Sequence, residues 1–141
     1  MRVLVLVKPY EAAPGAMPNA EDVAVMGKFN DELIAAGVMV DGAGLHPIAK
    51  GARLSFSANR PTVLDGPFAE TKEVIGGYWI WKVDSLQDAI DWARRAPMGE
   101  ADLELRPFME PEDFEGIATR EMIDEEKRWR EDQLAKAPKA G

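Results

Sequence analysis

A dense polar run carries the strongest sign of chemistry in this chain: Asp65-Gly-Pro-Phe-Ala-Glu-Thr-Lys-Glu73. It lies between two apolar segments and opens with Gly-Pro, which is typical of a loop with a defined shape. Asp65 stands at the expected end of a strand. Its carboxylate either faces a cleft or caps backbone N–H groups of its own loop. Glu70 is either a further acid of the site or a surface residue.

His46 is the single histidine of the chain and is followed by Pro47. Imidazole titrates near neutrality, so it can accept and return a proton at working pH. A carboxylate bound to one ring nitrogen would select the tautomer and stabilise the imidazolium. We therefore take His46 as a candidate general base and Asp65 as the partner that orients it. The alternative is that His46 is a turn residue beside the proline.

Candidate substrate-binding residues are of two kinds, cationic and aromatic. Arg53 and Lys72 could anchor a carboxylate or phosphate, and Lys50 could do the same. The alternative for these cations is surface solubility. Tyr78 and Trp79 could wall an apolar pocket, although strand aromatics of this kind also serve as core or interface residues.

The composition excludes several classes of site. The chain has 141 residues, no cysteine and one histidine, which argues against disulfides and zinc sites. It contains no phosphate-binding glycine loop and no nucleophile elbow, so we expect neither a metal nor a cofactor. A formal charge of −8 disfavours direct nucleic-acid binding. The apolar run at 3–7 is too short for a membrane span or an export signal, so we expect a soluble, cytoplasmic protein.

The elements that must position these residues follow from patterning. We expect two helices, over 20–36 with Asn19 as N-cap and from Ser85 to Pro97, together with strands at 3–7, 38–45, 53–57, 62–64, 77–83 and 103–107. The strand at 38–45 is expected to be broken at Gly42 and Gly44, and Asn59-Arg60-Pro61 is read as a turn. This order predicts an α+β fold of ferredoxin-like, split β-α-β type, with an extra hairpin in the middle.

The strand at 77–83 is apolar on both faces. Tyr78 and Ile80 point one way, and Trp79 and Trp81 point the other. Helices are expected on only one face of the antiparallel sheet, so the bare face must pack on something else. A second copy of the chain is the simplest choice, which predicts a homodimer in which two sheets form an α/β-barrel-like assembly.

Residues 110–141 differ in composition from residues 1–109 and are expected to form an acidic helical extension to the main domain. Thr119 is a candidate N-cap for a helix that reaches about residue 135. Its apolar residues are sparse, so this helix must lie on the body or on a partner subunit, anchored by Trp129. The last residues, 136–141, are expected to be disordered.

Several segments resemble the YCII-related proteins, in the branch named for a DGPF motif. The matching segments are Leu45-His-Pro47, Lys50-Gly-Ala-Arg53, Asp65-Gly-Pro-Phe-Ala-Glu-Thr-Lys-Glu73, Gly77-Tyr-Trp79, Ala89-Ile-Asp-Trp-Ala93 and Leu105-Arg-Pro-Phe108. The resemblance implies a ferredoxin-like, usually dimeric fold. It also implies a histidine–aspartate pair in a cleft, to which Asp65 and His46 are the residues that could correspond.

Two functional hypotheses remain open. The first is a cofactor-independent acid/base enzyme, an isomerase or lyase, that acts on a small polar or anionic molecule. The second is a non-catalytic module that binds a small ligand or a partner protein. Because genes of this branch often accompany extracytoplasmic-function sigma factors, the resemblance implies a regulatory or accessory role for that module.

Overall fold

The computed structural model describes residues 1–10, 18–57, 60–65 and 74–136. The elements in chain order are β1 Arg2–Pro9, α1 Ala20–Ala35, β2 Met39–Gly44, the short 3-10 helix η1 Ile48–Lys50, β3 Ala52–Ser57, β4 Arg60–Asp65, β5 Gly77–Lys82, α2 Leu86–Arg94, β6 Ala101–Pro107, the 3-10 helix η2 Pro111–Phe114 and α3 Arg120–Lys136. The expected α+β class is therefore confirmed.

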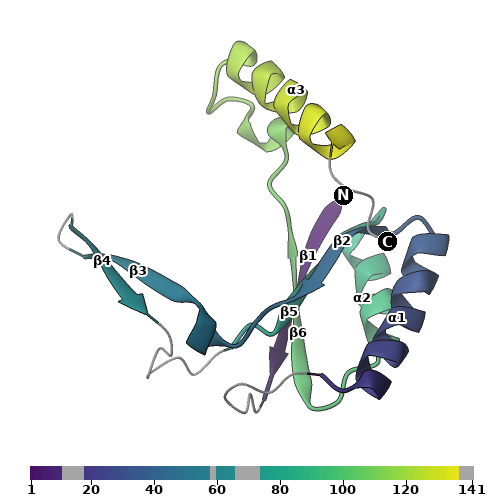
Figure 1. The fold of residues 1–141 in the computed structure, drawn as a ribbon. Helices are drawn as coiled ribbons and strands as arrows, with labels where there is room; N and C mark the ends of the chain where they lie inside the picture. The colour runs from purple at the N-terminus through teal and green to yellow at the C-terminus, as the bar shows by residue number, and fades with distance from the viewer. Residues whose placement is uncertain (11–17, 58–59, 66–73, 137–141) are drawn as a thin grey trace.

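Four strands form an antiparallel sheet in the order β2-β5-β1-β6, and both α1 and α2 cover the same face of it (Figure 1). The predicted alternation in β5 is confirmed. Trp79 and Trp81 lie in the core under the helices, whereas Tyr78 and Ile80 are only half-buried. The sheet stays open at its β2 and β6 edges, and no closed barrel is present among the described residues.

Both helices on the sheet begin where the sequence predicts, whereas α1 ends at Ala35, one residue early, and α2 ends at Arg94, three residues before Pro97. The Asn19 side chain accepts a hydrogen bond from the Asp22 N–H at 2.8 Å, and Asp22 returns one to the Asn19 N–H. Gly37 follows the helix with φ of +72°, a left-handed conformation that glycine adopts without steric cost. Ser85 caps α2 through the Asp88 N–H. The N-caps fix the residues at which α1 and α2 begin.

The expected break in the second strand is wrong. β2 continues through Gly42 to Gly44, with one register shift between Met39 and Asp41. The glycine is required by packing, because a Cβ atom on Gly42 would lie 2.7 Å from Cδ1 of Trp79. Glycine has a low propensity for strands, but at position 42 it is needed because the buried Trp79 indole lies against the backbone there.

The hairpin of β3 and β4 forms a separate two-stranded sheet that projects away from the helix-covered body (Figure 1). Its two strands pack on each other and share few contacts with any other described element. The turn expected at Asn59-Arg60-Pro61 is misplaced, because Arg60 and Pro61 belong to β4 and pair with residues of β3. Asn59 lies outside the described residues.

The C-terminal helix α3 packs mainly on η2, and Ile123 is its buried residue. Trp129 is 55 % exposed, so within one copy it does not anchor the helix as predicted. Lys127 pairs with Glu112 at 3.0 Å across that contact. Farther back, Arg2 pairs with Glu110 at 3.0 Å and ties the start of the extension to β1. The disorder expected from Lys136 onward is wrong for Lys136 itself, which is the last residue of α3, and residues 137–141 lie outside the described residues.

Candidate functional site

A large concave feature lies between the first half of α1 and the adjoining ends of β1, β2 and β5. It consists of a cavity of about 790 Å³ and a smaller one of about 410 Å³. Both are lined by Val7, Met26, Gly44, Gly76 and Met98, so they adjoin. We call the two cavities together the His46 cleft. Its size is that of pockets which hold small organic molecules.

Close approach of backbone segments forms the base of the His46 cleft. The Gly76 N–H donates to the Val7 carbonyl at 2.8 Å, and the Leu45 N–H donates to the Gly76 carbonyl at 3.0 Å. A Cβ atom on Gly77 would lie 3.0 Å from the Ala43 carbonyl oxygen. Gly76 and Gly77 let the strand ends approach closely, and both residues line the cleft.

Two polar contacts hold the smaller cavity in shape. The Trp79 indole N–H donates to the Asn30 side-chain oxygen at 2.9 Å, which fixes the indole against α1. The Tyr78 hydroxyl donates to the Asp41 carboxylate at 3.0 Å. That hydrogen bond, with a small contribution from burial, raises the pKa of Tyr78 above its ordinary value. Tyr78 therefore stays protonated at the cleft wall through the physiological range.

His46 lines the larger cavity from the segment between β2 and η1, and it is solvent-exposed. Glu21 and Asp22 at the start of α1 line the same cavity, as does Glu100. Among the described residues that line the His46 cleft, none is Lys or Arg. No described residue forms a hydrogen bond with the imidazole. The cleft thus presents one titratable nitrogen base, three carboxylates and otherwise largely apolar walls.

The structure brings together only part of the predicted site. Tyr78 and Trp79 line the smaller cavity and His46 lines the larger one. Arg53 is exposed on the projecting hairpin and lines neither cavity. Asp65 ends β4, where its backbone pairs with Ala52, but its side chain lies outside the described residues. The pairing of His46 with Asp65 therefore stays a prediction.

The remaining members of the polar run, Glu70 and Lys72 among them, also lie outside the described residues. The chain that directly follows the run is described: Val74 and Ile75 line the larger cavity beside His46. The described chain therefore resumes, directly after the polar run, in the lining of the cleft. Lys50, the other candidate cation, is exposed in η1.

Sequence reasoning missed the contribution of α1 to the site. Asn30 and Met26 line the cleft from α1, although the sequence analysis names neither of them as a site residue. Asn30 offered a usable signal, because an amide next to the buried Phe29 and three residues before the buried Leu33 needs a hydrogen-bond partner. The partner is an indole on β5, which no local pattern identifies.

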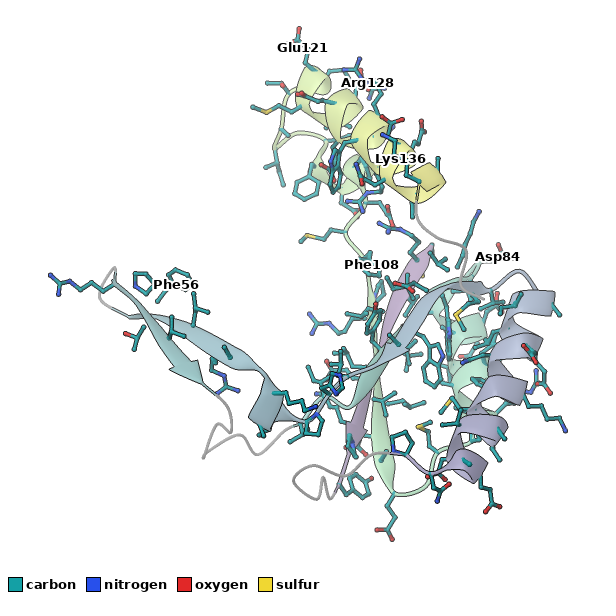
Figure 2. All side chains as sticks on the ribbon, in the orientation of Figure 1. Phe56, Asp84, Phe108, Glu121, Arg128 and Lys136 are labelled. Carbon is teal, nitrogen blue, oxygen red and sulfur yellow. The ribbon has the colours of Figure 1, made fainter. Side chains whose placement is uncertain are left out.

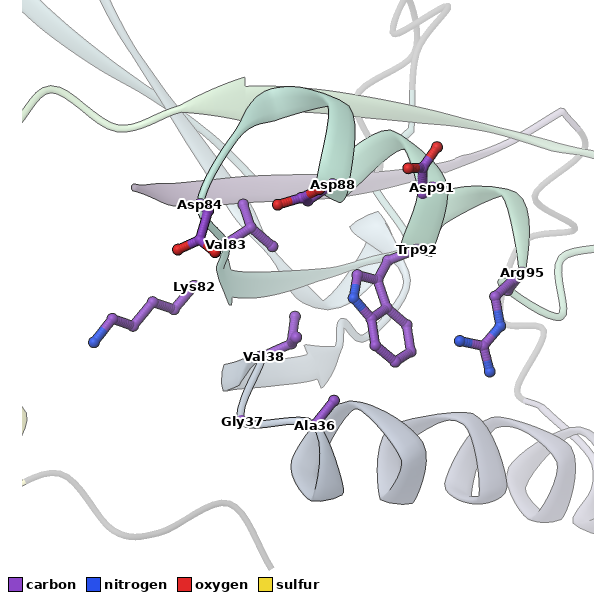
Figure 3. A pocket seen from close by; sticks show the side chains of 10 residues that line it. All are labelled: Ala36, Gly37, Val38, Lys82, Val83, Asp84, Asp88, Asp91, Trp92 and Arg95. Atoms are coloured by element: carbon purple, nitrogen blue, oxygen red, sulfur yellow. The ribbon is translucent and has the colours of Figure 1, made fainter.

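A third cavity, of about 610 Å³, opens at the other end of the helix layer (Figure 3). It lies between the end of α1 and the start of α2. The Trp92 indole reaches into it, and Lys82, Asp84, Asp88 and Arg95 stand around its rim (Figure 3). The Arg95 guanidinium lies over the Trp92 ring at 4.6 Å and pairs with Glu32. We call this third cavity the Trp92 cleft.

The described residues hold no group of three His, Cys, Asp or Glu side chains placed to bind a metal ion. No helix among them has the length and apolar character needed to cross a membrane. A family model described as the YCII-related domain matches residues 1–112. The chain is also similar to an uncharacterized protein of Rhizobium meliloti (strain 1021), 34% identical over 114 residues, which cover 77% of this chain and 92% of that protein.

Proposed function

Because the chain belongs to the YCII-related family and the similar Rhizobium meliloti protein is uncharacterized, we propose a function from the geometry of the His46 cleft. The cleft binds a small organic molecule that is neutral or cationic, and His46 exchanges a proton with it. The observation that carries this proposal is the position of the single histidine on a cavity of about 790 Å³.

The charge of the lining supports the choice of ligand class. Glu21, Asp22 and Glu100 line the larger cavity, and the described lining supplies no cation. An anionic ligand would have to approach these carboxylates without a compensating charge from the described lining. An amine, amide or alcohol would instead find hydrogen-bond acceptors beside an apolar wall. Of the polar and anionic molecules expected from the sequence, the described lining favours the polar ones.

The chemistry proposed for His46 is general acid–base help to an isomerisation or elimination. Such help contributes about 10²–10⁴-fold to a rate when the base is in hydrogen-bond reach of the proton it moves. Asp65 is kept as the proposed orienting partner, because Val74 and Ile75, which follow its polar run, line the same cavity as His46.

The fold is proposed to be the DGPF branch's ferredoxin-like arrangement, which the β2-β5-β1-β6 order supports.

One observation favours a second function, ligand binding without catalysis. A catalytic imidazole is ordinarily held in one tautomer by a hydrogen bond to its second nitrogen. None of the described residues supplies that bond to His46. In this second function the cleft is a sensor or carrier site, and the histidine only contacts the ligand.

A screen of small amines, amides, alcohols and carboxylates by thermal shift would test ligand binding. We expect stabilising ligands among the first three groups, with binding lost in Met26→Trp, which fills the cleft, and retained in Trp92→Phe, which alters the other cleft. Stabilisation by carboxylates alone, or binding that Met26→Trp leaves unchanged, would contradict the proposal.

Deuterium exchange would then separate catalysis from binding. Each ligand found is incubated with the protein in D₂O and followed by proton NMR. Acid–base catalysis predicts loss of a carbon-bound proton signal with the wild-type chain, and loss of that exchange in His46→Gln with binding retained. Binding without exchange would favour the second function.

A further inference from the structure

Gly27 lies in the interior of α1, where glycine is unfavourable. Among the amino acids only proline is a poorer helix former. The helix nevertheless continues through this position from Ala20 to Ala35, so Gly27 does not mark a helix end. Its φ angle is not in the left-handed region, so its backbone conformation does not require glycine. The presence of glycine at this position needs another cause.

Close packing within the chain is not that cause. A Cβ atom on Gly27 would meet nothing within 4 Å outside its own stretch of helix. Gly42 is different, because a Cβ atom there would lie 2.7 Å from Trp79. An alanine at position 27 would therefore fit the described chain and would also favour the helix.

Two other glycines share this property with Gly27. Among the described residues, Gly27, Gly44 and Gly99 combine open space around the Cβ position with a φ angle outside the left-handed region. All three line the His46 cleft, Gly27 in the smaller cavity, Gly99 in the larger one and Gly44 in both. A glycine that its own chain does not require is typical of a position where another molecule approaches the backbone.

The smaller cavity, which Gly27 lines, is suited to an apolar group. Met26 and Trp79 contribute to its largely apolar lining. Two of its polar side chains, those of Asn30 and Tyr78, already make a hydrogen bond within the chain. Elsewhere, side chains of α1 and of the sheet meet in the layer between them (Figure 2). An apolar group bound in this cavity would gain affinity by leaving water.

The larger cavity offers the complementary chemistry. Asp22 lines both cavities and so lies at their junction, whereas Glu21, Glu100 and His46 line the larger one alone. None of the described residues that line it is Lys or Arg. An ammonium group there would meet carboxylates of opposite charge, which also accept its hydrogen bonds. Because the two cavities adjoin, one molecule can occupy both.

We propose that the ligand of the His46 cleft is an amine that carries an apolar group, and that Gly27 determines the room for that group. The apolar group lies against Gly27 and Gly44 in the smaller cavity, and the ammonium group lies near Asp22 in the larger one. This inference rests on the function proposed above and narrows its ligand class. Gly27 lowers the stability of the helix and keeps the space open.

Two amines that differ only in the apolar group test the proposal, 2-phenylethylamine and ethylamine. Each is titrated into the ¹⁵N-labelled full chain, and the amide signals of Gly44 and His46 report binding. The wild type is expected to bind 2-phenylethylamine at least about tenfold more tightly than ethylamine, because the ring leaves water. Gly27→Leu is expected to abolish that difference and to leave the affinity for ethylamine unchanged.

A smaller substitution separates this role from a structural one. Gly27→Ala is expected to raise the midpoint of thermal unfolding by about 3 °C, because alanine favours the helix. The same variant is expected to bind 2-phenylethylamine about fivefold or more weakly, because its methyl group occupies the ligand's space. Asp31→Ala is the matched control. It also adds an alanine to α1, but Asp31 is exposed and lines neither cavity, so both affinities should stay at the wild-type level.

Equal affinity of the wild type for the two amines would overturn the inference, and so would a ring preference that persists in Gly27→Leu. A lowered midpoint in Gly27→Ala would overturn it too, because packing within the chain would then require the glycine. No response to either amine would also overturn it. The proposed function falls separately, if none of the amines, amides and alcohols of the thermal-shift screen binds.

Discussion

The two clefts at opposite ends of the helix layer differ in how they are built. The His46 cleft is walled by apolar side chains over a glycine backbone, and its Trp79 indole is fixed by Asn30. The Trp92 cleft is rimmed by charged residues of both signs, of which Arg95 pairs with Glu32 and Asp91 accepts a hydrogen bond from Gln87. A rim of mixed charge presents no field of a single sign to a charged ligand. The His46 cleft instead combines a shaped apolar cavity with one histidine, which is why we place function there.

The largest expected effect separates the two tryptophans. Trp79→Ala removes a core indole that is 4 % exposed and should destabilise the protein by about 3–5 kcal/mol. Trp92→Ala removes a half-buried indole and should cost clearly less. Urea unfolding followed by far-ultraviolet circular dichroism measures both free energies. Equal losses would break the distinction between a structured and a peripheral cleft.

A smaller effect is expected from the glycine base of the His46 cleft. Gly42→Ala puts a methyl group where Trp79 lies at 2.7 Å, so the buried indole must shift, at a cost of about 1–3 kcal/mol. Gly44→Ala is the control, because nothing lies within 4 Å of its added Cβ atom. Thermal unfolding of the two variants should show a lowered midpoint for Gly42→Ala alone. Strand propensity alone would raise the midpoint of both variants, because glycine is less stable than alanine within a strand. A matching drop in Gly44→Ala would therefore show that the contact with Trp79 is not the cause.

The smallest effect concerns the pH behaviour of the cleft wall. A hydrogen bond to the Asp41 carboxylate raises the pKa of Tyr78, and one to Asp102 raises the pKa of Tyr10. The folded state holds these protons more tightly, so the stabilisation is present at neutral pH and is lost as pH rises past the ordinary tyrosine range.

Ultraviolet absorbance at alkaline pH follows the two tyrosines, which are all that the chain has. Asp41→Asn should lower the titration of one tyrosine towards its ordinary pKa and leave the other unchanged, and Asp102→Asn should do the reverse. An unchanged curve in Asp41→Asn would show that the hydrogen bond at the cleft wall does not persist in solution.

Local chemistry predicted much of the body. The caps at Asn19 and Ser85 and the left-handed Gly37 are decided by neighbouring residues, so a sequence window contains the whole cause. The alternation from Gly77 to Lys82 likewise fixes which side chains enter the core. These features determine how the helices cover the sheet, and residues of α1 and β5 form one wall of the site.

Features that depend on distant contacts were not predictable. Gly42 reads as a strand break until Trp79, 37 residues later in the chain, is seen to cross it. The separation of the β3–β4 hairpin from the main sheet depends on pairing choices that propensity does not encode. The site was predicted in part for the same reason: His46 and the aromatic strand were visible in the sequence, whereas Asn30 and Met26 gain their role only through the packing of α1.

Chemical-shift mapping of the ¹⁵N-labelled full chain, titrated with the ligands found by thermal shift, tests the central claim most directly. We predict that amide signals of Gly44, His46, Gly76 and Asn30 move together with one saturating dependence on ligand concentration, while those of Val83, Asp88 and Trp92 stay in place. Shifts centred on Trp92, or a uniform response with no saturation, would contradict the assignment of ligand binding to the His46 cleft.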